Sequence, residues 1–138
     1  AGFRACHGEI ICFLDADDQL CPIAAEATVR LFREANTVNV HWPLHIMDEN
    51  GRRTGEIIPR GSLPEEGVYE RIVREGPLYD WHLTPPTSGN AWARSFLKKV
   101  FPMPEAPYRL GADVYLITLA SLCGRRRRPP QPPGSWVT

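Results

Sequence analysis

A hydrophobic run that ends in a cluster of acids is the feature that most constrains this chain. Residues 10–14 are uniformly apolar, and Asp15, Asp17 and Asp18 follow at once. An unbroken apolar run bounded by polar residues predicts a buried strand of a parallel sheet, here over residues 9–14. Carboxylates this dense repel one another and contribute little to folding. We therefore expect an exposed acidic tip after the strand, which suits a divalent cation.

Length and charge indicate one globular domain. The chain has 138 residues, of which 43% are hydrophobic and 23% charged, a balance typical of folded proteins. Its 16 basic and 16 acidic residues cancel, but four of the basic ones are the arginines at 125–128, which leaves residues 1–124 at about −4. Such a body gives no electrostatic reason to expect nucleic acid as a partner. No apolar stretch reaches the roughly 18 residues that suggest a membrane span.

The four cysteines show no spacing typical of a zinc site or a redox pair. They are Cys6, Cys12, Cys21 and Cys123. Cys12 falls within the apolar strand, which predicts a buried free thiol. A zinc site is not expected, and a reducing cytoplasmic compartment fits this cysteine usage best.

Hydrophobic periodicity predicts alternating helices and strands, as in an α/β fold. Apolar residues recur every three to four positions after Pro22 and then alternate with polar ones from Thr37 to Met47. The segment 48–51 is a strong turn signal that predicts a hairpin. The expected elements are helices at 22–34, 66–74, 91–100 and 112–122, strands at 9–14, 37–47 and 54–58, and a loop at 77–90.

The last fifteen residues have a different composition. Residues 124–138 contain four Arg, four Pro and two Gly, so they hold too little apolar surface to order themselves and are predicted to be a disordered tail. Residues 1–123 are then the folded domain. Arg126, Pro129 and Pro132 match an SH3-ligand spacing, but such matches arise easily by chance, and we interpret this segment as an unstructured tail.

Three other interpretations of the acidic tip are open. A calcium-binding loop would use the acids and amide at Asp15, Asp17, Gln19 and Glu26, but Leu20 stands where that loop requires glycine and a strand precedes it. A haloacid-dehalogenase-type phosphatase also places Asp-x-Asp after a strand, yet it continues with Gly or Thr where Asp18 and Gln19 stand. The third interpretation is a solvated loop that caps the next helix.

Two regions carry a family resemblance. The sequence from Gly8 to Pro22 closely resembles the metal-binding segment of inverting family 2 glycosyltransferases, which place Asp-x-Asp at the end of a strand in the nucleotide-sugar domain. A second region is similar to the acceptor-side half of bacterial members of that family. It comprises residues 86–94, 102–105 and 111–116.

The resemblance implies a fold and a site. The fold is a partial Rossmann-like nucleotide-diphospho-sugar transferase fold of the α/β class with a mixed sheet, whose N-terminal half we expect to be missing, because the match begins in the middle of the family pattern. Asp15 and Asp17 would hold Mn²⁺ or Mg²⁺ and the nucleotide. Asp113 would be the catalytic base, although Ala112 replaces the more usual Glu. The alternative for Asp113 is an ordinary acid at a helix N-terminus, where the helix dipole favours it.

The same resemblance implies partners and a reaction. The reaction is metal-dependent transfer of a sugar from a nucleotide-diphosphate sugar to a glycan, lipid-linked or protein acceptor with inversion, as in cell-envelope polysaccharide synthesis. The expected location is cytoplasmic, with the inner face of the membrane left open. The alternative is a non-catalytic remnant or interaction module. His41 and His45 are interpreted as a polar surface pair, and His82 lies in a loop that contacts acceptors in related enzymes.

Overall fold

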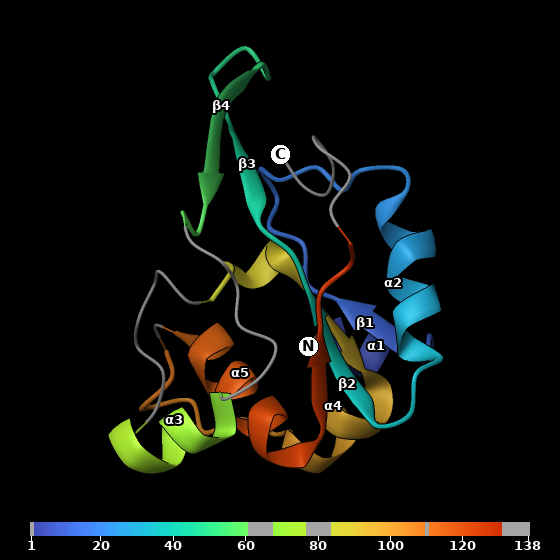
Figure 1. The fold of residues 1–138 in the computed structure, drawn as a ribbon, viewed down its shortest axis with the longest axis vertical. Coiled ribbons are helices and arrows are strands. Elements are labelled where there is room, and N and C mark those ends of the chain that lie inside the picture. The colour runs from blue at the N-terminus through green and yellow to red at the C-terminus, as the bar shows by residue number, and fades with distance from the viewer. Residues whose placement is uncertain (1, 61–67, 77–83, 110, 131–138) are drawn as a thin grey trace.

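Two sheets and their flanking helices make up the computed structural model, which describes residues 2–60, 68–76, 84–109 and 111–130 (Figure 1). The larger sheet has four strands, in the order β1 (Ile10–Cys12), β5 (Asn90–Ala93), β2 (Thr37–His41) and β6 (Arg125–Arg127). β5 runs antiparallel to both of its neighbours, whereas β6 is parallel to β2. The predicted α/β fold with a mixed sheet is confirmed.

Helices lie on both sides of this sheet, as Figure 1 shows. α2 (Ala24–Phe32) contacts β2 from one side. The helices α3 (Val68–Glu75), α4 (Arg94–Val100) and α5 (Ala112–Cys123) pack together on the other side, and the short α1 (Gly2–Ala5) precedes β1. The predicted helices at 22–34 and 112–122 correspond to α2 and α5, and the one at 66–74 corresponds to α3 within the described residues.

Each face of the sheet has its own hydrophobic core. Under α2, Ala24, Val40 and Ala91 are almost fully buried. On the opposite face, Trp92 packs with side chains of α4 and α5. Burial on both faces is what holds the short strands in place, because a short strand gains little from its own hydrogen bonds.

The predicted hairpin is confirmed. β3 (Leu44–Met47) and β4 (Arg53–Ile58) form an antiparallel pair that projects from the body (Figure 1). In the turn, the Asp48 carboxylate accepts hydrogen bonds from the backbone N–H groups of Asn50 and Arg52, each at 2.9 Å. Gly51 has φ 74°, a conformation that glycine adopts without strain.

Three predicted elements are wrong in their extent. The strand at 37–47 is two strands, because β2 ends before Trp42 and Pro43, and the Trp42 N–H donates to the Gly89 carbonyl instead (3.0 Å). The helix at 91–100 begins only at residue 94, because the residues before it form β5. The predicted buried parallel strand at 9–14 is shorter. β1 lies at one edge of the described sheet, pairs antiparallel with β5, and leaves Leu14 exposed.

The prediction of a buried Cys12 thiol is also wrong. Successive strand residues point to opposite faces, so Ile11 fills the core and Cys12 is exposed at the edge of the sheet. All four cysteines are free.

The prediction of a disordered tail from residue 124 is wrong for residues 124–130. β6 pairs in parallel with β2, and Arg126 is only 3% exposed. The chain passes so close to β2 that a Cβ on Gly124 would lie 2.6 Å from a Val38 methyl group. Composition does not reveal this, because the strand is ordered by its pairing with β2. The predicted tail beyond residue 130, including Pro132, lies outside the described residues.

Candidate active site

The acidic tip follows β1 as expected. Asp15 and Asp17 are exposed, Asp18 is half-buried, and the Asp18 N–H donates to the Asp15 carbonyl at 3.1 Å. This bond closes a tight turn that contains all three aspartates. The turn needs support from elsewhere, because mutual repulsion of the acids opposes it.

Ser88 supplies that support. Its Oγ accepts a hydrogen bond from the Asp15 backbone N–H at 2.9 Å, across 73 residues of sequence. Ser88 is buried and lies in the 3₁₀ turn η1 (Thr87–Gly89), directly before β5. The bond joins the two sequence regions that resemble the glycosyltransferase pattern, so the acidic tip and η1 lie against one another.

A chain of buried amides holds η1. The Asn90 side-chain NH₂ donates to the Pro86 carbonyl at 2.9 Å, and the Asn39 NH₂ donates to Asn90 Oδ1 at 3.3 Å. Asn39 Oδ1 in turn accepts from Arg126 Nε at 3.1 Å. Both asparagines are fully buried. Sequence analysis did not identify this network; the one available signal was an asparagine at residue 39 between two valines of a predicted strand.

Gly89 is required by close packing. A Cβ at this position would lie 2.6 Å from the Trp42 carbonyl oxygen and 2.7 Å from Pro85 Cβ. Only a residue without a side chain fits between these two groups. The glycine therefore lets η1 lie against the end of β2.

A cavity of about 270 Å³ lies beside η1, and the predicted base, Asp113, is one of the residues that line it. Phe13, which leads into the acidic tip, and Thr87 of η1 line the same cavity. The remaining described lining residues are Trp92, Phe101, Met103, Ala112 and Leu116. One hollow thus borders the segment before the tip, the turn that anchors the tip, and the N-terminus of α5.

Asp113 stands in the first turn of α5 and is half-buried. Its Oδ1 accepts a hydrogen bond from the Val114 N–H at 2.9 Å. Gly111, just before the helix, has φ 94°, which lets the chain turn sharply into α5. These features also fit the alternative of an ordinary helix N-terminal acid; the cavity is what distinguishes Asp113 from one.

Comparison with known proteins identifies the family. Residues 1–101 match the family model described as glycosyl transferase family 2. The chain belongs to this family. It is 34% identical over 125 residues to a Nostoc sp. protein named as an uncharacterized glycosyltransferase, a match that covers 91% of this chain and 38% of that protein. The chain thus spans well under half the length of that relative. No solved structure matches it.

The predicted family resemblance is therefore confirmed, and with it the partial nucleotide-sugar transferase fold. The acidic tip and η1 lie within the matched residues, whereas Asp113 lies beyond residue 101. The roles assigned to Asp15, Asp17 and Asp113 stay predictions.

The acidic tip fits a divalent cation that is shared with a ligand. Within the described parts of this family 2 chain, no group of three or more His, Cys, Asp or Glu side chains converges as a complete metal site. Mg²⁺ is usually held by one or two carboxylates together with substrate phosphates and water, and Asp15 and Asp17 match that mode. The calcium-loop alternative is not formed, because a strand, β1, precedes the acidic tip where that motif has a helix, and the Glu26 carboxylate pairs with Arg30 at 2.5 Å.

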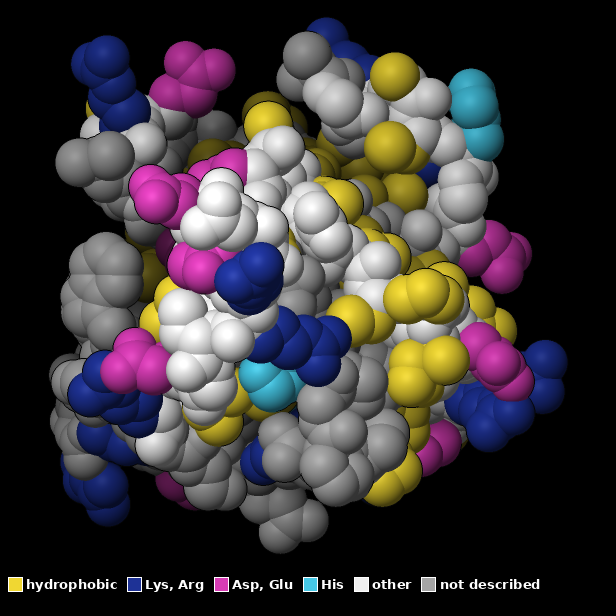
Figure 2. Space-filling view, turned by 90° about the horizontal axis from the view of Figure 1, so that it is seen from above, with side chains coloured by type: hydrophobic (Ala, Val, Ile, Leu, Met, Phe, Trp, Pro, Cys, Tyr) yellow, Lys and Arg dark blue, Asp and Glu magenta, His cyan; other side chains and the backbone are white. Residues whose placement is uncertain are grey.

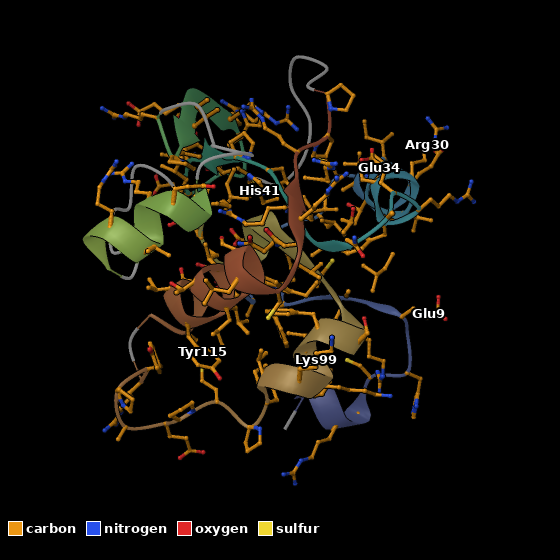
Figure 3. The ribbon with its side chains drawn as sticks, turned by 60° about the horizontal axis from the view of Figure 1, so that its bottom comes forward. Glu9, Arg30, Glu34, His41, Lys99 and Tyr115 are labelled. Carbon is orange, nitrogen blue, oxygen red and sulfur yellow. The ribbon has the colours of Figure 1, made fainter. Side chains whose placement is uncertain are left out.

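The predicted surface pair of histidines is wrong. His41 is fully buried at the end of β2, and Figure 3 shows it inside the molecule, whereas His45 is half-buried in the hairpin. Burial, and then the positive charges of Arg126 and Arg128, hold the pKa of His41 well below its ordinary value. Neither ring nitrogen has a hydrogen-bond partner among the described residues. His82 and the loop around it lie outside those residues.

Arg126 is a second buried titratable group, and its positive charge acts on His41. Burial lowers its pKa to about 10, so the guanidinium is still charged at neutral pH. Its Nε bonds to Asn39, while within the described structure its two terminal nitrogens have no partner.

Charged side chains of both signs lie on the described surface. Figure 2 shows acidic and basic side chains interspersed on the face seen from above. Among the helices that the structure describes, none is long and apolar enough to cross a membrane.

Proposed function

We propose that this family 2 chain takes part in transferring a sugar from a nucleotide-diphosphate sugar to an acceptor hydroxyl, with a divalent cation and with inversion. The observation that carries the proposal is the bond from the Asp15 N–H to Ser88 Oγ, with the cavity next to it. Phe13, two residues before Asp15, and Thr87, next to Ser88, line the same cavity as Asp113, which supports a donor side and an acceptor side close to one another. A donor and an acceptor can therefore meet there.

The acidic tip is the donor side of this proposal. Asp17 and Asp15 would hold Mn²⁺ or Mg²⁺, and the cation supplies charge neutralisation for the diphosphate that leaves. Both carboxylates are exposed, so they can reach a ligand without displacing protein groups. The Ser88 bond fixes the backbone of Asp15 and keeps the tip from turning away. Fixed positioning of this kind contributes a large part of enzymatic rate enhancement.

Asp113 is the acceptor side. Its carboxylate would take the proton from the attacking hydroxyl. A hydroxyl in the cavity would approach the sugar from the side of Asp113, while the diphosphate departs toward the tip. Displacement from opposite sides inverts the anomeric centre. We propose a cytoplasmic location on the basis of four free thiols.

The experiment is a sugar-transfer assay with the protein. Radiolabelled sugar nucleotides are supplied with Mn²⁺, and NMR reads the anomeric configuration of the product. Asp113→Asn should lower turnover by about a thousandfold or more while donor affinity stays nearly unchanged. The control is Glu49→Gln, an exposed acid in the hairpin turn.

Retention of configuration, or turnover by Asp113→Asn close to that of the unmodified protein, contradicts the assigned roles. The alternative of a non-catalytic interaction module predicts no transfer from any donor and no effect of nucleotide on metal binding.

A further inference from the structure

Most of the described side chains that line the cavity beside Asp113 are apolar, although the proposed acceptor group is a polar hydroxyl. Five of its eight described lining side chains are apolar throughout, and the other three, Trp92, Thr87 and Asp113, carry a hydrogen-bonding group. A bare sugar presents a hydroxyl on nearly every carbon, and each one that loses water without a partner costs free energy. The described walls offer those hydroxyls almost nothing.

The negative charge of Asp113 further limits the chemical class of ligand that the cavity can bind. Asp113 is the only charged side chain among the described lining residues, and the acidic tip follows two residues after Phe13 in the sequence. An anionic acceptor would meet like charge in a site of low polarity, which is costly. A neutral hydroxyl can instead donate a hydrogen bond to the Asp113 carboxylate.

Size sets a limit as well. An apolar protein cavity of about 150 Å³ is enough to bind benzene. The cavity here, about 270 Å³, takes one aromatic ring with several further carbon atoms, or an alkyl chain of similar volume.

Contacts with neighbouring side chains hold the described residues in and around the cavity in place before a ligand binds. Trp92 is 1% exposed and stacks on Phe96 with ring centroids 5.9 Å apart. Phe101 meets Phe13 edge-on at 6.4 Å. The Tyr115 hydroxyl donates to the Val100 carbonyl at 2.7 Å, and Figure 3 shows this side chain reaching from α5 toward the segment after α4. A ligand therefore binds without first ordering these side chains.

We propose that the acceptor is a neutral alcohol whose hydroxyl is carried on a hydrophobic body, an aryl or alkyl group that fills this cavity. The inference rests on the proposed function and adds the acceptor class to it. The half-buried side chains of Phe13, Phe101 and Met103 hold the hydrophobic body, and Asp113 receives its hydroxyl. An aromatic aglycone and a lipid chain share this chemistry.

The test measures binding to the chain itself by ligand-observed NMR, without any turnover. The probes are benzyl alcohol for the aromatic source, 1-hexanol for the lipid source, glucose as a neutral polyol and benzoate as an anion. We expect saturable binding of at least one of the two alcohols. Glucose and benzoate should each bind at least about tenfold more weakly than that alcohol.

The decisive variants place a larger side chain in the cavity. Ala112→Phe should weaken binding of the alcohol by about tenfold or more, and the smaller replacement Ala112→Leu by a lesser factor, which guards against a folding defect of the larger one. Ala25→Phe is the matched control, because Ala25 is an exposed alanine of α2 on the other side of the sheet. Its binding should equal that of the unmodified chain.

Preferential binding of benzyl alcohol assigns the aromatic source, and preferential binding of hexanol assigns the lipid source. No saturable binding of either alcohol, glucose binding as tight as theirs, or unchanged binding in both Ala112 variants would overturn the inference. Metal binding at Asp17 is measured separately. If it holds while alcohol binding fails, the acceptor class is wrong and the proposed reaction stands; the reverse outcome leaves the cavity site and removes the reaction.

Discussion

Ser88 Oγ accepts the backbone N–H of Asp15 at 2.9 Å, although the two residues are 73 positions apart. The bond is the one direct hydrogen bond described between the acidic tip and η1. It places the Asp-x-Asp motif against the start of the acceptor-side segment. The position of the motif thus depends on a side chain that is not itself a ligand.

Ser88→Ala should therefore weaken both the fold and the tip. The loss of this partly buried hydrogen bond is expected to lower the free energy of unfolding by about 1 kcal/mol, and the freed tip should bind Mn²⁺ with nucleoside diphosphate several-fold more weakly. Urea denaturation and calorimetry measure the two effects. The control is Ser121→Ala, whose hydroxyl bonds to the Ile117 carbonyl within α5 and adds little stability. Equal metal affinity in both variants would show that Ser88 does not position the tip.

Gly89→Ala should destabilise the protein strongly. Its Cβ would come within 2.6 Å of the Trp42 carbonyl oxygen, so backbone must move, and the expected loss is about 2 to 4 kcal/mol of unfolding free energy. Thermal and urea unfolding measure it. Gly2→Ala is the control, since no atom lies within 4 Å of the added Cβ there. Similar stability of the two variants would mean that η1 is free to move away from β2.

The sequence predicts the elements whose signals are local. α2 and α5 have helical periodicity, and the 48–51 turn predicts the β3–β4 hairpin, because each depends on residues that are neighbours in the chain. The acidic tip after β1 was predicted for the same reason. The family was identified from this tip and from the segment that holds Ser88.

The failures have one physical origin, which is tertiary pairing. β5 is four residues long and merges with the apolar pattern of α4, so only its pairing with β1 and β2 defines it. β6 is a run of arginines that composition assigns to a tail, and its pairing with β2 buries Arg126. His41 was placed on the surface because alternation cannot show that both faces of β2 are covered.

The stability of the protein should fall in mild acid because of His41. The unfolded chain protonates this histidine near its ordinary pKa of about 6.5, while the folded state keeps the pKa well below that value, mainly through burial. The contribution of neutral His41 to stability is therefore fully present above about pH 6.5 and is lost progressively as the pH falls below it. From about pH 7.5 to about pH 5, a histidine that stays neutral in the folded state lowers the free energy of unfolding by about 2 kcal/mol.

Urea denaturation across this pH range measures the loss. His41→Gln should remove that part of the pH dependence, while His7→Gln, at an exposed position, should keep it. The same pH dependence in His41→Gln and in the unmodified chain would show that His41 is not the group responsible.

The central claim is that the acidic tip holds a divalent cation jointly with a nucleotide diphosphate. Titration calorimetry of Mn²⁺ into the chain, with and without a nucleoside diphosphate, tests it most directly. Two exposed carboxylates alone bind weakly, so we expect the nucleotide to tighten Mn²⁺ binding by about tenfold or more. Asp17→Asn should abolish this tightening, and Glu49→Gln should preserve it. Mn²⁺ affinity that does not respond to nucleotide, or that is equal in Asp17→Asn and the unmodified chain, would contradict the account.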